Sequence, residues 1–324
     1  MKIGNTTIER YPLLLAPMED ITDRSFRRIA KRFGADMMYT EFIASEALIR
    51  NVKKTFAKLE IEDEERPIGI QIYGHLIESM VEAAKIAEEA QPDLIDINFG
   101  CPVKKIAGRG AGSGIFQDIP KMIAMTEAIV KAVKLPVTVK TRLGWDDNSK
   151  VIDQLAERLQ DTGIKALTIH GRTRAQLYKG TADWSLIGKI KENPAIHIPI
   201  IGNGDITDGP SAQAAINSYG VDGIMIGRAA IGRPWIFKEL RHYLETGEEM
   251  PEPSVEEKVA IAKEHFLESV RLKGEPRGIF EMRRHFALYF KGLPHFKPLR
   301  LKLLTSLDQD EIFGLLDEIA ETYG

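Results

Sequence analysis

Short apolar runs alternate with longer amphipathic segments along most of the chain. Eight of the apolar runs, each bounded by Gly, Pro or Asp, predict strands at residues 13–18, 36–42, 68–74, 94–100, 137–144, 165–171, 199–206 and 223–229. Between them, residues 75–90, 119–133 and 151–163 have the period of amphipathic helices. Such alternation is typical of βα units around a parallel sheet. Eight units in about 240 residues predict an α/β fold of the (β/α)8 TIM-barrel type rather than a doubly wound sheet.

The pattern changes at residues 244–258, where two prolines and several glutamates indicate a linker. Beyond it, residues 254–274, 277–293 and 309–324 have helical spacing and no strand pattern. The sequence therefore predicts a barrel domain at residues 1–247, followed by a small all-helical domain at 248–324.

Composition narrows the class of protein only slightly. With 44% hydrophobic residues, 28% charged residues and a net charge of -3, the chain is an ordinary globular protein without a global preference for nucleic acid. Its single cysteine excludes an internal disulfide, and no apolar run reaches the roughly 18 residues needed to span a bilayer. The N-terminal apolar run is too short for a signal peptide, so we expect a cytoplasmic location.

Polar residues gather where the predicted strands end. In a parallel barrel these ends converge on one mouth, where catalysis normally occurs. The residues in question are Pro17, Met18 and Glu19; Glu41; Gln71; Asn98 and Cys101; Lys140 and Arg142; His170, Arg172 and Thr173; Asn203, Gly204 and Asp205; and Gly227 and Arg228. The glycines of "IGNGDI" and "MIGRAA" either form tight turns or let backbone N–H groups approach a phosphate, and their occurrence after strands seven and eight favours a phosphate-bearing ligand.

Three side chains at these strand ends are candidates for catalysis or ligand binding: Lys140, His170 and Cys101. Alternation along its strand places Lys140 inside the barrel, where it forms a Schiff base, holds a positive charge against an electron-rich cofactor, or extends to solvent. His170 is either a core residue or part of an anion-facing site beside Arg172. No further His, Cys or carboxylate stands at metal-ligand spacing, so no metal site is predicted.

Cys101 lies between a glycine and a proline, just beyond a strand. A free thiol has a pKa of about 8.5 and is mostly protonated at neutral pH, which suits a proton donor. A nucleophilic role would normally require a paired histidine, and a structural role is the remaining alternative.

The segment 271–302 is strongly basic. Nine Lys and Arg residues against two Glu give it a charge of +7, with five aromatic residues interleaved: Phe280, Phe286, Tyr289, Phe290 and Phe296. We expect the charges to contact RNA in a salt-dependent manner and the aromatic residues to form the core of the helical domain. Additional basic residues could extend this track across the barrel mouth: Lys104, Lys105, Arg109, Arg172, Arg174 and Lys179.

Six motifs in order give the chain a resemblance to the tRNA-dihydrouridine synthases over essentially its whole length. They are "APMEDITDRSFR", "DINFGCP", "VTVKTRLGW", "TIHGRTRAQLYKGTADW", "NGDI" and "MIGRAAIGRPWIF". The segments "GCPVKK" and "RAAIGRPWIF" are most similar to the bacterial B-type branch. Gly114, within "KKIAGRGAGSGIF", departs from the residue that many members carry.

The resemblance implies a TIM barrel that binds FMN, a helical domain that binds tRNA, and NADPH or NADH as electron donor. It implies reduction of the C5=C6 bond of uridines in tRNA, with hydride passing from the flavin to C6 while Cys101 protonates C5. By matching position, the cofactor-binding residues are Pro17, Met18, Glu19, Gln71, Lys140, His170, Asn203, Gly204, Asp205, Gly227 and Arg228. The corresponding substrate-binding residues are Asn98, Lys104, Arg109, Arg142, Arg172, Arg174, Arg283 and Arg284.

Two other classes of function remain open from the residues alone. An aldolase or isomerase barrel would use Lys140 to form an imine with a phosphorylated substrate and would contain no flavin. A noncatalytic RNA-binding protein would need neither Lys140 nor Cys101.

Overall fold

The computed structural model describes residues 1–8 and 11–324, and within these ranges eight parallel strands form a barrel. The strands are β3 (Leu13–Leu15), β4 (Met38–Tyr39), β6 (Ile68–Tyr73), β7 (Leu94–Asn98), β8 (Val137–Arg142), β9 (Leu167–His170), β10 (Ile200–Asn203) and β11 (Gly223–Ile226). They pair in the order β3-β11-β10-β9-β8-β7-β6-β4, and a parallel bridge between Leu14 and Met37 brings the two ends together. The predicted TIM barrel and all eight predicted strands are confirmed.

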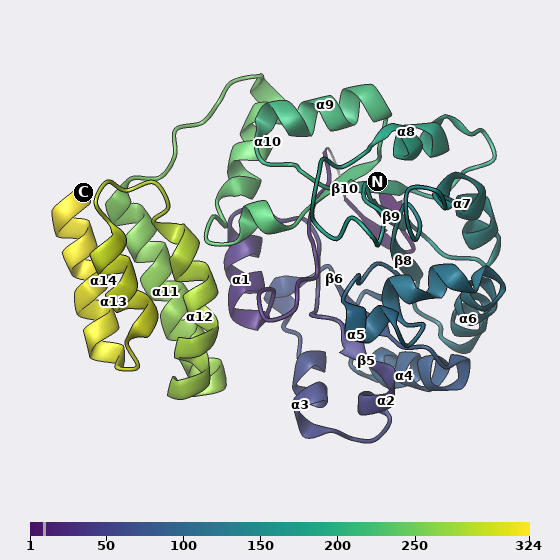
Figure 1. Ribbon diagram of the computed structural model, residues 1–324, viewed down its shortest axis with the longest axis horizontal. Coiled ribbons are helices and arrows are strands. Elements are labelled where there is room, and N and C mark those ends of the chain that lie inside the picture. Colours follow the sequence, from purple (N-terminus) through teal and green to yellow (C-terminus); the bar gives the residue numbers. More distant parts are fainter. Residues whose placement is uncertain (9–10) are drawn as a thin grey trace.

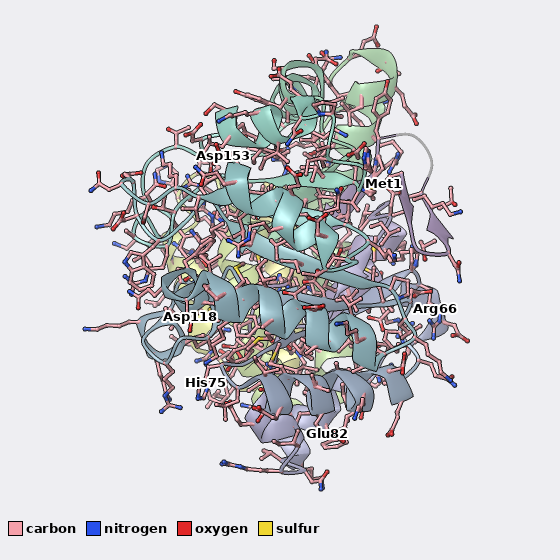
Figure 2. All side chains as sticks on the ribbon, turned by 90° about the vertical axis from the view of Figure 1, so that its right-hand side faces the viewer. Met1, Arg66, His75, Glu82, Asp118 and Asp153 are labelled. Atoms are coloured by element: carbon pink, nitrogen blue, oxygen red, sulfur yellow. The ribbon has the colours of Figure 1, made fainter. Side chains whose placement is uncertain are left out.

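Helices surround this barrel (Figure 1). They are α1 (Arg24–Arg32), α2 (Ser45–Leu48), α3 (Lys53–Phe56), α4 (Ile77–Glu89), α5 (Lys104–Ala107), α6 (Ile119–Ala132), α7 (Ile152–Asp161), α8 (Ser185–Glu192), α9 (Gly209–Tyr219) and α10 (Ile236–Thr246). Local chemistry fixes several of their ends: the Asp118 side chain accepts a hydrogen bond from the N–H of Lys121 at the start of α6, and Gly220 ends α9 in the left-handed conformation. Figure 2 shows the outer layer face on, with Glu82 of α4 and Asp153 of α7 labelled.

Alternation along the strands divides the buried side chains into two sets. One set faces the helices and includes Ile95, Val139 and Ile169. The other fills the amino end of the barrel interior and includes Leu94 and Ala166. It also contains Ile3 and Ile8, which belong to a small N-terminal hairpin, β1 (Lys2–Ile3) with β2 (Thr6–Thr7), and its flank. The hairpin therefore covers the end of the barrel opposite to the strand ends that carry the predicted site.

Short 3-10 turns and one extra strand complete the barrel. The strand is β5 (Ile43–Ala44), which pairs with β6, and the turns are η1 (Ala57–Leu59), η2 (Asp63–Glu65), η3 (Gly112–Gln117) and η4 (Arg228–Ala230). The sequence pattern did not predict β1, β2 or β5, because two residues are too few to reveal a periodicity.

The C-terminal part of the chain is a helical bundle at one side of the barrel (Figure 1). It consists of α11 (Val255–Lys273), α12 (Glu275–Tyr289), α13 (Lys297–Thr305) and α14 (Gln309–Tyr323). Three of these helices match predicted segments, whereas α13 falls where no helix was predicted. The bundle has its own hydrophobic cluster, which includes Phe266 and Leu316 and which Ile29 of α1 joins from the barrel.

The aromatic residues of the basic segment do not all behave alike. Phe286, Tyr289, Phe290 and Phe296 are buried in the bundle, so the prediction of a core role is confirmed for them. It is wrong for Phe280, which is 49% exposed on α12.

Ion pairs and rings join the bundle to α1 and to the residues just before it. Across this joint Lys273 pairs with Asp23, Arg28 with Glu268, Arg32 with Glu264, and Arg284 with Asp20. The ring of Phe26 packs on those of His265 and His285, with centroids 5.5 and 4.5 Å away. None of the helices in the described ranges has the length and apolarity to cross a membrane.

Candidate active site

A cavity of about 730 Å³ opens at the carboxyl ends of the barrel strands. This volume lies within the range of small-molecule and cofactor sites, roughly 300–1,000 Å³. Of the predicted site residues, the following line it: Pro17, Met18, Glu19, Asn98, Cys101, Lys140, Arg142, His170, Asn203, Gly204, Asp205, Gly227 and Arg228. Residues scattered over more than 200 positions of sequence therefore share one cavity.

The strand register explains why these side chains meet. Asn98 of β7 lies opposite Lys140 of β8, and Asn203 of β10 lies opposite His170 of β9. Arg142 of β8 lies opposite His170 as well. Because every second residue points into a barrel, these positions present their side chains to the barrel interior at the carboxyl ends of the strands.

Lys140 contributes a partly buried positive charge to the cavity wall. Its ammonium donates a hydrogen bond to Asn203 Oδ1 over 3.1 Å, and no ion pair among the described residues includes it. Burial, together with the neighbouring charge of Arg142, lowers the pKa of Lys140 to about 8. The ammonium therefore remains charged at neutral pH and is stabilised by any anionic or electron-rich ligand that enters.

Arg142 is held by backbone oxygens. Its guanidinium donates to the carbonyls of Gly100, Thr173 and Leu177 at 2.7 to 3.0 Å. The ring of Tyr178, at the cavity mouth, lies 5.6 Å from this guanidinium and 5.1 Å from that of Arg228. No pattern in the sequence singles out Tyr178, because it lies in an irregular loop.

His170, Arg172 and Asp205 form a connected group beside this wall. Arg172 is almost fully buried, and its guanidinium bonds Asp205 at 2.7 Å and contacts His170 Nε2 at 3.3 Å. Burial and the surrounding cations hold the pKa of His170 well below its usual range, so the imidazole is neutral. Because a guanidinium only donates, Nε2 is the accepting nitrogen.

The ends of β10 and β11 supply a small basic pocket. Arg228 pairs with Asp205 at 3.3 Å and remains about half exposed. Gly204 has a φ of +131°, and a Cβ there would lie 2.8 Å from Ala182 Cβ and 3.1 Å from the ring of His170. Only glycine fits this turn. Together, the glycine backbone and Arg228 make this end suitable for a phosphate, while Arg172 and Arg228 neutralise the carboxylate of Asp205.

Cys101 lies in the loop after β7 and is 8% exposed. Its N–H donates to Asn98 Oδ1, and its carbonyl accepts from both the N–H and the hydroxyl of Ser113. Burial raises the pKa of the thiol, so the sulfur is protonated at neutral pH. No described histidine is hydrogen-bonded to it. These properties suit a proton donor better than a nucleophile.

Gln71 lies beneath the cavity wall and is fully buried. Its side chain bonds Asn98 and Asp96, and Asp96 also accepts from the Thr138 hydroxyl. Burial raises the pKa of Asp96 to about 6. Sequence reasoning passed over Asp96, although an acidic residue in the middle of an apolar strand is itself an unusual signal.

Three carboxylates gather at the rim. The side-chain oxygens of Glu19, Asp20 and Glu41 lie within 4.8 Å of one another, an arrangement that the sequence spacing did not reveal. Lys58 pairs with Glu19 and Glu41, and Arg284 pairs with Asp20. Basic side chains therefore already neutralise this cluster in part.

The remaining predicted substrate-binding residues lie outside the cavity lining. Lys104 and Arg109 are exposed on and after α5, and the guanidinium of Arg174 stacks on Trp145, 4.4 Å from the ring centroid. Arg283 and Arg284 lie on α12: the first bonds the carbonyls of Thr305 and Ser306, and the second bonds Asp20. The buried Arg172 also lies outside the lining, but its guanidinium bonds two lining residues, His170 and Asp205.

The lining as a whole fits an electron-rich ring that carries an anionic group. Lys140 and Arg142 supply positive charge that no carboxylate within the described residues pairs with, and Arg228 with the glycine turns supplies an anion site. Pro17, Met18, Met225 and Ile231 add apolar surface against which a ring could pack.

Comparison with known proteins identifies a family. Residues 14–322 match the family described as dihydrouridine synthase (Dus). A probable tRNA-dihydrouridine synthase of Rickettsia bellii is 42% identical over 324 residues, which cover 100% of this chain and 98% of the relative. A tRNA-dihydrouridine synthase B of Pseudomonas putida is 41% identical over 302 residues, covering 93% of this chain and 89% of the relative.

Solved structures with the same fold are more distant in sequence. Histamine dehydrogenase from Rhizobium matches with a TM-score of 0.60 and 14% identity, over 100% of this chain and 64% of that chain. A morphinone reductase in complex with tetrahydroNAD matches with a TM-score of 0.52 and 12% identity, over 78% of this chain and 91% of that chain. At these identities the likeness shows the barrel fold alone.

Proposed function

This chain belongs to the dihydrouridine synthase family, and from that premise we propose that it reduces the C5=C6 bond of uridines in tRNA, using FMN and a nicotinamide donor. The observation that carries the proposal is the shared cavity of Cys101 and Lys140. A protonated thiol and a partly buried ammonium on one cavity are the proton source and the positive charge that a hydride reduction needs.

The residues of the lining that would hold FMN divide by chemistry. Arg228 and the backbone at Gly204 and Gly227 suit its phosphate, Lys140 suits the electron-rich part of its ring, and Pro17 and Met18 supply apolar contact. His170, Asn203 and Asp205 support these groups through the contacts described above, and Gln71 supports Asn98 from below. Glu19 stands at the rim. A reduced flavin, when bound, supplies a hydride that adds at C6 of the uracil.

The chain itself supplies the other hydrogen. The buried thiol of Cys101 keeps its proton at neutral pH and would donate it to C5, after which solvent returns a proton to the sulfur. NADPH, or NADH, provides the two electrons, so one hydride and one proton together convert the double bond to a single bond. Asn98 and Arg142, next to Cys101 on the cavity wall, offer hydrogen bonds to the uracil edge.

The target base must leave the folded RNA to reach this cavity, because its reacting carbons are otherwise shielded by stacking. We propose that the barrel domain, residues 1–247, carries the chemistry, and that the helical domain, residues 248–324, binds tRNA. Support for the second role comes from α13 and the loop before it, where Lys291, Lys297, Arg300 and Lys302 are exposed. None of the ion pairs within residues 1–8 and 11–324 includes these four. Lys104, Arg109 and Arg174, together with Arg283 and Arg284, would extend contact between this surface and the mouth, whereas Arg172 is buried and supports the cavity wall through Asp205 and His170.

Reoxidation of the flavin by tRNA tests the proposal. We expect the purified protein to be yellow, to be bleached by NADPH, and to regain colour when undermodified tRNA is added, with dihydrouridine detected in the RNA by mass spectrometry. Cys101→Ala should slow this recovery at least about 100-fold, the usual minimum for loss of a general acid, without slowing bleaching by NADPH. Lys85→Ala, on the outer helix α4, is the control.

Either of two results would contradict the proposal. A wild-type rate of recovery in the Cys101 variant would remove the thiol from the reaction. A colourless protein that borohydride traps with a keto substrate would instead favour imine chemistry at Lys140.

A further inference from the structure

A chain of hydrogen bonds connects a buried carboxylate inside the barrel with the backbone of Cys101. Asp96 of β7 accepts from Gln71 Nε2 at 2.6 Å. Gln71 Oε1 accepts from Asn98 Nδ2 at 2.8 Å, and Asn98 Oδ1 accepts from the N–H groups of Gly100 and Cys101, each at 2.9 Å. Three side chains on two neighbouring strands thus lead from the barrel interior to the catalytic loop.

The direction of this series of hydrogen bonds is fixed at both ends. An ionised carboxylate only accepts hydrogen bonds, and a backbone N–H only donates. Each amide between them can therefore take only one orientation: Gln71 points its NH₂ at Asp96 and its oxygen at Asn98, and Asn98 points its oxygen at the loop. Turning either amide over would bring two donors face to face.

Burial makes this orientation costly to break. Asp96 is 1% exposed, Gln71 0%, Asn98 7% and Cys101 8%. Water has little access to replace a lost partner, and a buried polar group without one destabilises the protein by about 1–3 kcal/mol. The loop is also held from its other side, since the Cys101 carbonyl accepts from Ser113.

We propose that Asp96 is a positioning residue for Cys101: by orienting the amides of Gln71 and Asn98 it holds the N–H groups of the catalytic loop, and with them the thiol, at the cavity wall. The catalytic meaning of this position rests on the proposed function. The positioning itself does not, because it can be measured on the sulfur alone.

Two substitutions of Asp96 separate positioning from charge. Asp96→Leu removes the acceptor of Gln71. Asp96→Asn removes the charge but keeps an oxygen for Gln71, because its NH₂ can turn to the hydroxyl of Thr138, which now bonds Asp96 at 2.5 Å and can accept instead. The positioning role therefore predicts that only the leucine variant releases the loop.

The rate at which iodoacetamide alkylates Cys101 reports the outcome, because this is the only cysteine of the chain. We expect Asp96→Leu to raise the rate roughly tenfold, the factor that corresponds to losing about one net hydrogen bond. The rate in Asp96→Asn should stay within about twofold of wild type. In a pH series the leucine variant should also move the apparent pKa of the thiol down toward its ordinary value, as the sulfur gains contact with water.

An unchanged alkylation rate in Asp96→Leu would overturn the proposal, and so would equal rates in the two variants. If Asp96→Leu does not fold, Gln71→Met interrupts the same series of hydrogen bonds between Gln71 and Asn98. The same two criteria then apply to its alkylation rate. Failure of the protein to form dihydrouridine would contradict the proposed function and leave the alkylation result to decide the positioning role by itself.

Discussion

Lys140 destabilises the folded protein but supplies a positive charge that the proposed function uses. Its ammonium is partly buried and, within residues 1–8 and 11–324, hydrogen-bonds one amide oxygen, that of Asn203; its pKa is lowered from 10.5 to about 8. Burying a charge without a counter-charge is unfavourable, so the folded protein tolerates this lysine at a cost. Such a cost is expected where a bound, electron-rich ligand completes the environment.

This cost predicts a pH-dependent stability. Below pH 8 the lysine is charged in both the folded and the unfolded chain. Between pH 8 and 10.5 the folded protein has lost the proton while the unfolded chain still binds it, so stability rises with pH in this window. Lys140→Met should therefore stabilise cofactor-free protein at pH 7 by on the order of 2 kcal/mol, and this gain should shrink toward pH 10.

Urea unfolding of both proteins at pH 7 and pH 9.5 measures the effect. Asp96 titrates near pH 6 and contributes little to the difference between these two pH values. A stabilisation that does not change with pH would show that the ammonium is not the source of the cost.

Among the elements, the loop after β7 depends on close packing at Gly114. A Cβ at this position would lie 2.1 Å from the carbonyl oxygen of Ala107 at the end of α5. The neighbouring atom is backbone and cannot turn away, so the loop needs glycine here.

Gly114→Ala should lower the free energy of unfolding by about 1–3 kcal/mol, the usual range for overpacking. The matched control is Gly314→Ala in α14, where an added Cβ meets no atom within 4 Å. That change should stabilise the protein by about 0.5–1 kcal/mol, because alanine is the better helix former. Thermal unfolding of the two variants should shift in opposite directions, and a shift in the same direction would contradict this packing argument.

A second element, α12, carries an exposed aromatic ring. The guanidinium of Arg283 lies 4.6 Å from the centroid of Phe280 and is itself tied to the carbonyls of Thr305 and Ser306. Arg284, one turn of α12 beyond Phe280, donates a hydrogen bond to the backbone carbonyl of Asp20 beside the cavity rim. The ring is thus held in orientation on α12, one turn from a residue that contacts the rim, and offers a surface on which an unstacked base of a bound tRNA could stack.

Phe280→Ala should weaken tRNA binding roughly tenfold, because stacking of one base on an aromatic ring contributes about 1–3 kcal/mol. Thermal stability should hardly change, since the ring is half exposed. Leu288→Ala removes another exposed apolar side chain of α12 that has no π face, and serves as the control in a filter-binding assay. Equal losses in the two variants would exclude stacking.

The elements also show where sequence reasoning succeeds. Buried parallel strands appear in the sequence as continuous apolar runs, and the rule that their carboxyl ends converge predicted that Lys140, His170 and Asn203 share one cavity.

Other features could not be predicted from the sequence. The segment of α13, "KPLRLKLLT", has leucines at alternating positions and a proline near its start, so its period indicated neither a helix nor a strand clearly. The exposure of Phe280 and the hydrogen bonds of Gln71 depend on which side chains meet in three dimensions, and no local pattern encodes that.

At the scale of the whole molecule, the joint between barrel and bundle determines which basic residues remain available. Of the nine cations in residues 271–302, Arg271, Lys273, Arg277 and Arg284 pair with carboxylates, two of them across the joint to Asp23 and Asp20. Arg283 is bound to backbone carbonyls. The charge of +7 that the sequence shows is therefore divided: one part holds the domains together, and Lys291, Lys297, Arg300 and Lys302 face solvent on the bundle.

These four cations should dominate the salt dependence of tRNA binding. Each phosphate that a protein neutralises contributes about 0.7–0.9 to the slope of log K against log salt concentration. Replacing all four by glutamine should therefore reduce the magnitude of the slope by roughly three. A control variant with the same change in net charge replaces Lys85, Lys121, Lys131 and Lys134, which lie on or next to α4 and α6, on the opposite side of the molecule from the bundle (Figure 1). Its slope should match the wild type, and equal reductions in the two variants would show that total charge, rather than the bundle surface, attracts the RNA.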